Sequence, residues 1–222
     1  MLIILFDSNG NIDTENAIIP ETLGGILKPS STEVYAYTET STGNGNTVAK
    51  DIDGFIDSVR TNGGYYIARF EASQGTNNKA ESKYDKAIWN SINQPNAAEA
   101  CQDLYAGVNS DLMNSYAWDT AILFIQKYSG DEDYSRQGIL QSTLANTGKA
   151  ADGTICDVRC NIYDMAGNCY EWSTETYSYL ITPCVVRGGS CYNGSRYCTS
   201  TRNNVSTSGG NPHYFFRPLL YL

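Results

Sequence analysis

Residues 161–172 read NIYDMAGNCYEW, residues 185–190 read VVRGGS, and residues 215–218 read FFRP. All three motifs lie beyond Lys149, where short, turn-rich, aromatic segments replace any helical period. Gly, Asn and Ser, which favour turns, recur between the aromatic residues. The sequence therefore predicts a C-terminal part built from short strands and turns, not from helices.

The side chains of these motifs suit the scaffold of a fold with little regular structure. Trp172 and Phe216 are large enough to anchor a small core. Arg187 and Arg217 are expected to hydrogen-bond buried loop carbonyls, because backbone polar groups outside helices and sheets must still find partners. Three glycines permit backbone turns that a side chain would block, namely Gly167, Gly188 and Gly189.

Upstream of these motifs, the chain carries the signals of regular elements. GGYYIARFEAS, residues 63–73, alternates in the manner of a strand with both faces covered. Pro95, near the start of NAAEACQDLYAG, fits the first turn of a short helix. A longer helix is predicted within residues 110–128, with Ser110 or Asp111 as its N-cap. Its apolar side chains recur at helical spacings: Leu112, Tyr116, Trp118, Ile122 and Ile125. Helices early and irregular strands late favour an α+β domain over a parallel α/β sheet.

The first 60 residues form an N-terminal segment of unknown role, and residues 61–222 form the predicted domain. MLIILF, residues 1–6, is too short for a signal-peptide core and lacks a basic start, so we expect it to be a buried edge of the fold. TETSTGNGNTVAK, residues 38–50, is polar and rich in Gly and Asn, so we expect a loop there.

Composition and charge narrow the class of protein. The chain has 222 residues, 41% of them hydrophobic, which suits one compact domain. Its formal net charge of −9 argues against nucleic acid as the main partner. No stretch approaches the roughly 20 apolar residues of a membrane span, so we expect no membrane insertion. The chain has no phosphate-binding glycine motif, and its single histidine, His213, lacks the sequence context of a hydrolase triad.

Taken in order, NIYDMAGNCYEW, VVRGGS and FFRP resemble motifs of the formylglycine-generating enzyme (sulfatase-modifying factor) family, a branch of the C-type-lectin-like folds. GGYYIARFEAS resembles an early strand of the same family. The resemblance runs from about residue 63 to residue 222 and does not cover the first 60 residues. It implies an α+β, C-type-lectin-like fold that is irregular, with short strands and a few helices.

The oxidase chemistry of that family depends on two cysteines, whose places correspond to Asn193 and Cys198. The first cysteine is therefore missing here, while Cys191 stands two positions too early. A copper–thiolate site needs two sulfurs that converge on one ion. We therefore expect a protein that is not an enzyme. The seven cysteines are an odd set and, without an export signal, are expected to be reduced thiols.

The family also often binds calcium at the turn within NIYDMAGNCYEW. Carried over residue by residue, the resemblance implies the carboxylates of Asp164 and Glu171 and the backbone carbonyls of Gly167 and Cys169 as ligands. Oxygen donors of this kind suit a structural Ca²⁺. The alternative is a solvated turn in which Asp164 caps a bend and Glu171 faces water.

The last 36 residues, 187–222, draw on a different set of amino acids from the rest of the chain. They contain no Lys, Glu, Gln, Met or Trp, whereas the first 186 residues contain 29 of these. Those five amino acids are the ones that no codon ending in a pyrimidine encodes. The tail therefore resembles the variable region that diversity-generating retroelements make by replacing adenines in Asn-type codons. The alternative is a lectin-like loop that favours Ser, Asn, Gly and Tyr.

A tail of this composition suits ligand binding, because Tyr and Phe offer broad contact while Ser, Gly and Asn offer adaptable hydrogen bonds. The sequence predicts a non-catalytic ligand-binding, receptor-recognition protein, the variable protein of a diversity-generating retroelement in a phage or prophage. We expect a protein or glycan ligand on a cell surface. Without a signal peptide, the protein would be cytoplasmic when made and could join a virion.

Three alternatives to this function stay open. They are a formylglycine-generating-type oxidase acting on Cys-containing peptides, a carbohydrate-binding lectin and a purely structural phage module. The predicted ligand-binding residues all lie in the tail: Cys191, Tyr192, Asn193, Ser195, Arg196, Tyr197, Asn203, Asn204, Asn211, His213, Tyr214 and Phe215.

Overall fold

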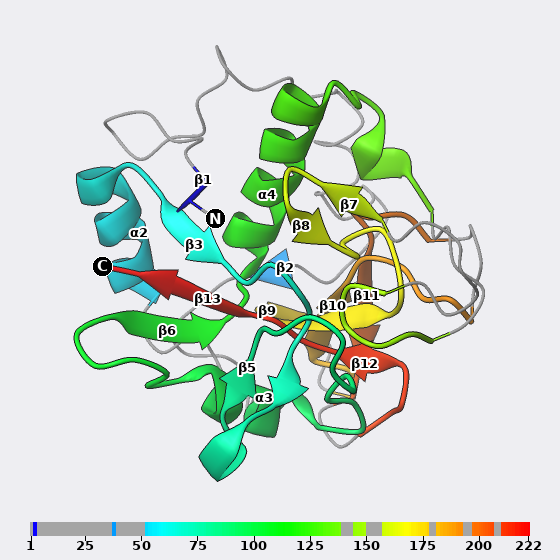
Figure 1. Ribbon diagram of the computed structural model, residues 1–222, viewed down its shortest axis with the longest axis horizontal. Helices are drawn as coiled ribbons and strands as arrows, with labels where there is room; N and C mark the ends of the chain where they lie inside the picture. The colour runs from blue at the N-terminus through cyan, green and yellow to red at the C-terminus, as the bar shows by residue number, and fades with distance from the viewer. Residues whose placement is uncertain are drawn as a thin grey trace.

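The computed structural model describes residues 2–3, 37–38, 52–138, 144–149, 157–177, 181–192, 197–206 and 210–222. Helices and short strands both occur in this part of the chain (Figure 1). The helices precede most of the strands along the sequence. The predicted α+β class is therefore confirmed.

The first of two central sheets has four antiparallel strands. Their order is β1 (Leu2–Ile3), β3 (Tyr65–Ile67), β13 (Pro218–Tyr221) and β6 (Asn109–Leu112). Figure 1 shows β13, in red, crossing the molecule between β3 and β6. The last strand of the chain is therefore interior to the sheet, not an edge.

The second sheet is built around β9 (Tyr170–Tyr177). On one side β9 pairs with β10 (Cys184–Arg187), which in turn pairs with β11 (Arg202–Val205). On the other side it pairs with β12 (Tyr214–Phe215), in parallel, and with β2 (Tyr37–Thr38). Two small hairpins complete the strands: β4 (Ser73–Gln74) with β5 (Ala80–Glu81), and β7 (Val158–Arg159) with β8 (Ile162–Tyr163).

The described part of the chain has the helices α2 (Ile52–Asn62), α3 (Gln94–Cys101) and α4 (Ser115–Ser129), with 3-10 turns at Thr76–Asn78 and Tyr134–Arg136. As predicted, Pro95 lies in the first turn of α3, and Asn93 caps that turn by accepting from the backbone N–H of Asn96. Among the described residues, no helix is long and apolar enough to cross a membrane.

Helix α4 confirms the predicted helix but begins later than predicted. Residues up to Leu112 belong to strand β6, and Asn114 is the N-cap, its side-chain oxygen accepting from the N–H of Ala117 at 2.8 Å. Ser110 instead accepts from the N–H of Leu104 at 2.9 Å. The prediction that Ser110 or Asp111 caps the helix is therefore wrong, because pairing with β13 holds both residues in the sheet.

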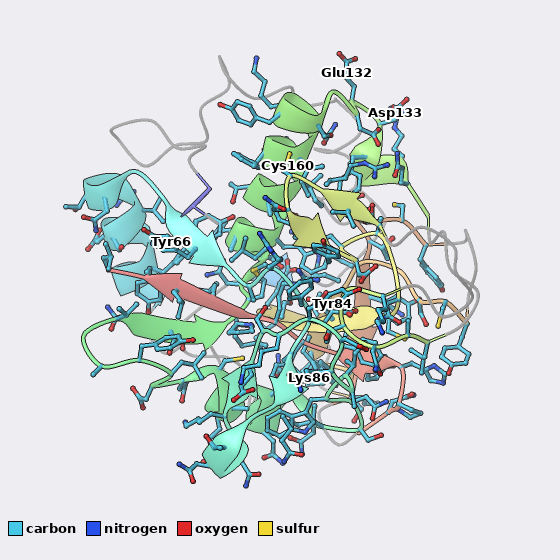
Figure 2. All side chains as sticks on the ribbon, viewed as in Figure 1. Tyr66, Tyr84, Lys86, Glu132, Asp133 and Cys160 are labelled. Carbon is cyan, nitrogen blue, oxygen red and sulfur yellow. The ribbon has the colours of Figure 1, made fainter. Side chains whose placement is uncertain are left out.

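Strand β3 is shorter than predicted and covered on one face. It ends at Ile67, and Tyr66 is 40% exposed on the open face, where Figure 2 labels it. Beyond Ile67 the chain is no longer a strand but still runs beside the C-terminal segment, where the N–H of Ala72 donates to the carbonyl of Phe216 at 2.8 Å. The prediction of two covered faces over residues 63–73 is therefore wrong.

The described parts of the N-terminal segment pack with the rest of the fold. Phe55 and Val59 of α2 are buried, and the Phe55 ring contacts the rings of Tyr65 and Tyr221 at centroid distances of 5.4 and 5.5 Å. Strand β1 lies at the edge of the first sheet, and the burial predicted for residues 1–6 stays a prediction. The predicted boundary after residue 60 falls inside α2, and the division of the chain stays a prediction. Most of the predicted loop at residues 38–50 lies outside the described residues.

Candidate ligand-binding site

Arg187, the last residue of β10, is fully buried and fixes the start of the tail against α4. Its guanidinium donates to the carboxylate of Asp119 at 2.5 Å and to the carbonyl of Thr201 at 3.2 Å. Arg202 of β11 pairs with Asp119 at 3.1 Å and with Glu175 at 2.8 Å. The positive charges of Arg187 and Arg202 therefore match the negative charges of the Asp119 and Glu175 carboxylates in one largely buried network.

Arg217, just before β13, is the second fully buried anchor. Its Nε donates to Glu171 at 2.7 Å, and its Nη2 donates to the other oxygen of the same carboxylate. The guanidinium also donates to the carbonyls of Ala68 at 3.3 Å and Tyr163 at 2.9 Å. Together with Arg187, these contacts confirm that both arginines hydrogen-bond buried backbone carbonyls.

Between the two anchors, several predicted tail side chains reach the surface. Tyr192 is 56% exposed, and its ring meets the His213 ring edge-on at a centroid distance of 3.8 Å. Tyr197 and Tyr214 are half-buried, and both pack on Tyr170, at 5.8 and 6.2 Å between centroids. We call the four tail residues Tyr192, Tyr197, His213 and Tyr214 the aromatic tail cluster.

The predicted ligand-binding residues in β11 and β12 lie on both faces of the second sheet. Through β10, Asn203 is in register with Trp172, and the Tyr214 ring packs on Trp172 at 4.9 Å. Asn203 and Tyr214 therefore share one face. Asn204 and Phe215, each the next residue along, point to the opposite face. The Asn204 side chain is used there in a 2.6 Å hydrogen bond to the hydroxyl of Thr182.

Two predicted contact residues are buried. Phe215 is 1% exposed and Cys191 is 7% exposed, so the prediction that their side chains face a ligand is wrong. Phe215 is buried because β12 pairs with β9, which turns this ring into a small apolar cluster with both Cys191 and Cys169. Asn211 is half-buried and accepts from the N–H of His213 at 2.9 Å. Three predicted residues lie outside the described residues: Asn193, Ser195 and Arg196.

The turn predicted to bind calcium is buried. Glu171 is fully buried and both its oxygens accept from Arg217, so the alternative in which Glu171 faces water is wrong. Asp164 is 1% exposed, has a φ of 60°, and accepts at its carbonyl from the N–H of Gly167 at 3.2 Å. Cys169 is also buried, directly before β9.

Asp164 belongs to a group of buried carboxylates with Asp157 and Glu71. Burial and then the charge of Asp157 raise the pKa of Asp164 to about 7. Burial and then Asp164 raise the pKa of Glu71, whose Oε2 accepts from Asn168 at 2.9 Å. Among the described residues, Glu71 Oε1 has no hydrogen-bond partner.

The carboxylate oxygens of Asp164, Asp157 and Glu71 are of the kind that can bind calcium, whereas the charge of Glu171 is already matched by Arg217. Within the described part of the chain, no three His, Cys, Asp or Glu side chains converge as a metal site requires. Calcium at this turn stays a prediction.

The two cysteines nearest the family's oxidase positions have separate neighbours. The Cys198 Sγ lies 3.4 Å from the hydroxyl of Ser200 and 3.5 Å from that of Thr201. The Cys191 Sγ lies 3.9 Å from the Sγ of Cys169. All six described cysteines are free thiols.

The sequence did not indicate Tyr170, which supports the aromatic tail cluster, because its contact with Tyr214 arises from the parallel pairing of distant strands. It also missed a pocket of about 680 Å³ beside α3, lined in part by Trp89, Asn93 and Asn96. Gly210 of the tail borders this pocket, and a Cβ there would come within 2.6 Å of the Ser91 carbonyl oxygen. In the sequence, the only feature that could have indicated this pocket is the number of Asn residues near α3, and Asn is equally typical of loops.

Comparison with known proteins does not identify a family or a function for this chain. No protein-family model matches the chain, and neither a curated protein nor a solved structure matches it.

Proposed function

We propose that this chain is a non-catalytic ligand-binding protein, the variable protein of a diversity-generating retroelement, whose tail presents the binding surface. The observation that supports this proposal is a contrast in burial along the tail. Arg187 and Arg217 are fully buried, whereas Tyr192 between them is 56% exposed. A fixed frame with replaceable side chains between its anchors is what evolvable recognition requires.

The chemistry of the surface fits a macromolecular ligand. The aromatic tail cluster offers rigid rings, and the nearby amides of Asn203 and Asn211 offer hydrogen bonds. Tyrosine, histidine and asparagine together can contact either a protein or a glycan. The oxidase alternative is less favoured, because Cys191 and Cys198 each contact other groups.

Two libraries, one at exposed or half-buried positions and one at buried positions, test which residues form the scaffold and which form the surface. One library randomises Tyr192, Tyr197 and Tyr214, and the other randomises Trp172 and Phe216, which are fully buried. We expect most members of the first library to stay folded with melting temperatures near that of the parent. Most members of the second should unfold, because truncating a buried aromatic costs about 3–5 kcal/mol. Equal loss of folding in both libraries would show that the tail is core, and the proposal would fail.

The coding sequence around the gene tests the retroelement part separately. We expect a nearby near-copy of the segment encoding residues 187–222 that differs from it at adenines. If no such copy exists in the source genome, the retroelement part falls while ligand binding by the tail still stands on the library experiment.

A second candidate, carbohydrate binding, is favoured by the pocket beside α3. Its wall presents Asn77 and Asn96, whose side-chain amides make no hydrogen bond to the described residues, and the indole of Trp89. Lys79 donates its ammonium group to the carbonyls of Glu99 at 3.0 Å and Gln102 at 2.8 Å, so its charge is largely engaged. Amides, an aromatic face and the carboxylate of Glu99, which can accept from hydroxyl groups, suit a sugar.

A glycan array with three forms of the protein distinguishes the two surfaces. Asn96→Ala removes an exposed amide from the pocket, and Tyr192→Ala removes an exposed ring from the tail. Loss of glycan signal only in Asn96→Ala would assign binding to the pocket. Loss only in Tyr192→Ala would assign it to the tail, and no glycan signal in the wild type would leave proteins as the expected ligands.

A further inference from the structure

Two buried cysteines from separate parts of the chain lie in contact. The Sγ atoms of Cys169 and Cys191 are 3.9 Å apart, and the two residues are 2% and 7% exposed. Cys169 immediately precedes β9, and Cys191 lies beyond the end of β10 at the start of the tail. The N–H of Cys191 donates to the carbonyl of Asn168 at 2.8 Å. Because Cys169 directly follows Asn168 in the sequence, this backbone hydrogen bond holds Cys191 beside Cys169.

The surroundings of the pair keep the two sulfurs facing each other. Phe215 packs against both cysteines, with Ile88 and Leu144 partly covering the cluster. The hydroxyl of Ser190 lies 3.7 Å from the Cys169 Sγ. Apart from this hydroxyl, no hydrogen-bonding side chain of the described residues contacts either sulfur. Each thiol therefore has the other as its nearest reactive group.

The two thiols also differ in exposure, since Cys191 is 7% exposed and Cys169 is 2% exposed. A small disulfide should therefore reach the Cys191 sulfur first, and the more deeply buried Cys169 thiol is placed to resolve the mixed disulfide.

We propose that Cys169 and Cys191 are a redox-active pair that forms an intramolecular disulfide by exchange with a low-molecular-weight disulfide such as oxidised glutathione. The proposal does not depend on the ligand-binding function. It assigns a modification site to the junction between the scaffold turn at residues 161–172 and the tail.

The exchange proceeds in two balanced steps. The Cys191 thiolate attacks one sulfur of the small disulfide, whose S–S bond breaks and whose other half leaves as a thiolate. The Cys169 thiol then loses its proton and attacks the Cys191 Sγ, which expels the second small thiolate and forms the protein disulfide. Two protein thiols and one small disulfide become one protein disulfide and two small thiols, which carry away the two protons.

The other four described cysteines have neighbours of a different kind, and Cys160 packs against the core cluster that contains Trp118. The Cys184 thiol donates to the side-chain oxygen of Gln94 at 3.2 Å, and the Cys198 sulfur faces the hydroxyls of Ser200 and Thr201. Cys101 is fully buried in the core cluster around α3. Oxidation should therefore select one pair.

The crosslink would join positions 22 residues apart in the sequence. Closing a loop of this size restricts the unfolded chain, so we expect the melting temperature to rise by roughly 5–10 °C. The disulfide would also fix the backbone next to the exposed Tyr192. Oxidation would therefore stiffen one end of the tail.

The experiment incubates the reduced full-length wild type with oxidised glutathione and maps disulfides by mass spectrometry after alkylation of free thiols. We expect a mass loss of two hydrogens, a Cys169–Cys191 crosslinked peptide and a raised melting temperature that a reductant reverses. This mapping needs no variant, so it does not depend on whether a mutant folds.

Three variants complete the test. Cys198→Ser should still form the crosslink, whereas Cys191→Ser should not. In Cys169→Ser the resolving thiol is gone, so Cys191 should be retained as a mixed disulfide with glutathione. A crosslink between other cysteines, or wild-type protein whose Cys169 and Cys191 both stay alkylatable after prolonged oxidation, would overturn the proposal.

Discussion

Arg217 faces three buried carboxylates, Glu171, Glu71 and Asp164, and one guanidinium cannot neutralise all of them. Glu171 takes both strong hydrogen bonds. Glu71 and Asp164 are left to lower their charge by holding protons, because burial disfavours a charged carboxylate. At the scale of single residues, this group makes the stability of the fold depend on pH.

The pH dependence has a definite sign. The pKa of Asp164 is raised from 3.8 to about 7, so the folded state binds its proton more tightly than the unfolded state does. The resulting stabilisation is complete below the unfolded pKa and is lost as the pH rises through about 7. We therefore expect the melting temperature to rise when the pH is lowered from about 8 to about 5. Thermal melts of wild type and Asp164→Asn check this, and the variant should show a flatter pH profile. An equal fall in both proteins on acidification would contradict it.

Calcium should act on the same group. If Ca²⁺ binds at Asp164, metal-stripped protein at neutral pH should gain melting temperature on adding calcium and lose it on adding a chelator, because an ion bound only to the folded state stabilises that state. Asp164→Asn should abolish the gain. Asp133→Asn is the matched control, since Asp133 is exposed beyond the C-terminal end of α4 (Figure 2). An unchanged melting curve in the metal-stripped wild type would remove the predicted site.

At the scale of elements, the start of α4 is set both by its N-cap residue and by strand β6, which ends just before it. Asn114 satisfies a free N–H of the first turn, and Gly130 ends the helix with a φ of 76°, in the left-handed region. Ser110 and Asp111 are equally good capping residue types. They are unavailable because both pair with β13.

Asn114→Ala should therefore lower the free energy of unfolding by about 1–2 kcal/mol, because it removes the cap acceptor from a buried helix start. Asn114→Ser should retain most of the stability, since a hydroxyl can accept the same bond. Urea unfolding monitored by circular dichroism measures both. Equal losses in the two variants would indicate that packing of the Asn114 side chain, not capping, is what matters.

At the scale of the whole molecule, the two ends of the described chain close the same sheet. Strand β13 inserts between β3 and β6, and Figure 1 shows the C-terminus beside α2, where the N–H of Leu222 donates to the hydroxyl of Ser58 at 3.1 Å. Between the buried Arg187 and Arg217, the tail alternates buried residues such as Phe215 with exposed ones such as Tyr192.

Replacing one of these anchors should affect the whole fold. Arg187→Ala leaves the buried Asp119 with Arg202 alone and should lower the free energy of unfolding by about 3–5 kcal/mol. Tyr192→Ala, on the exposed part of the tail, should change it by no more than about 0.5 kcal/mol. Urea unfolding of both variants measures the difference. Similar losses would mean that the exposed part of the tail is as structural as its anchors.

The sequence by itself determined the α+β class, the helix around Trp118, the proline start of α3 and the use of Arg187 and Arg217 to bind backbone carbonyls. These are local properties: periodicity, capping signals and the hydrogen-bonding capacity of a residue type act over a few neighbouring positions. The family resemblance, the calcium turn and the retroelement tail stay predictions.

The tertiary structure decided which residues meet and which face they occupy. It placed Phe215 inside, gave the α4 cap to Asn114 and brought Cys169 against Cys191. Each outcome depends on pairing between strands far apart in the sequence, such as β12 with β9 and β13 with β6. A shift of one residue in such a pairing exchanges the two faces of a strand, and the residue types within the strand do not record which partner it will have.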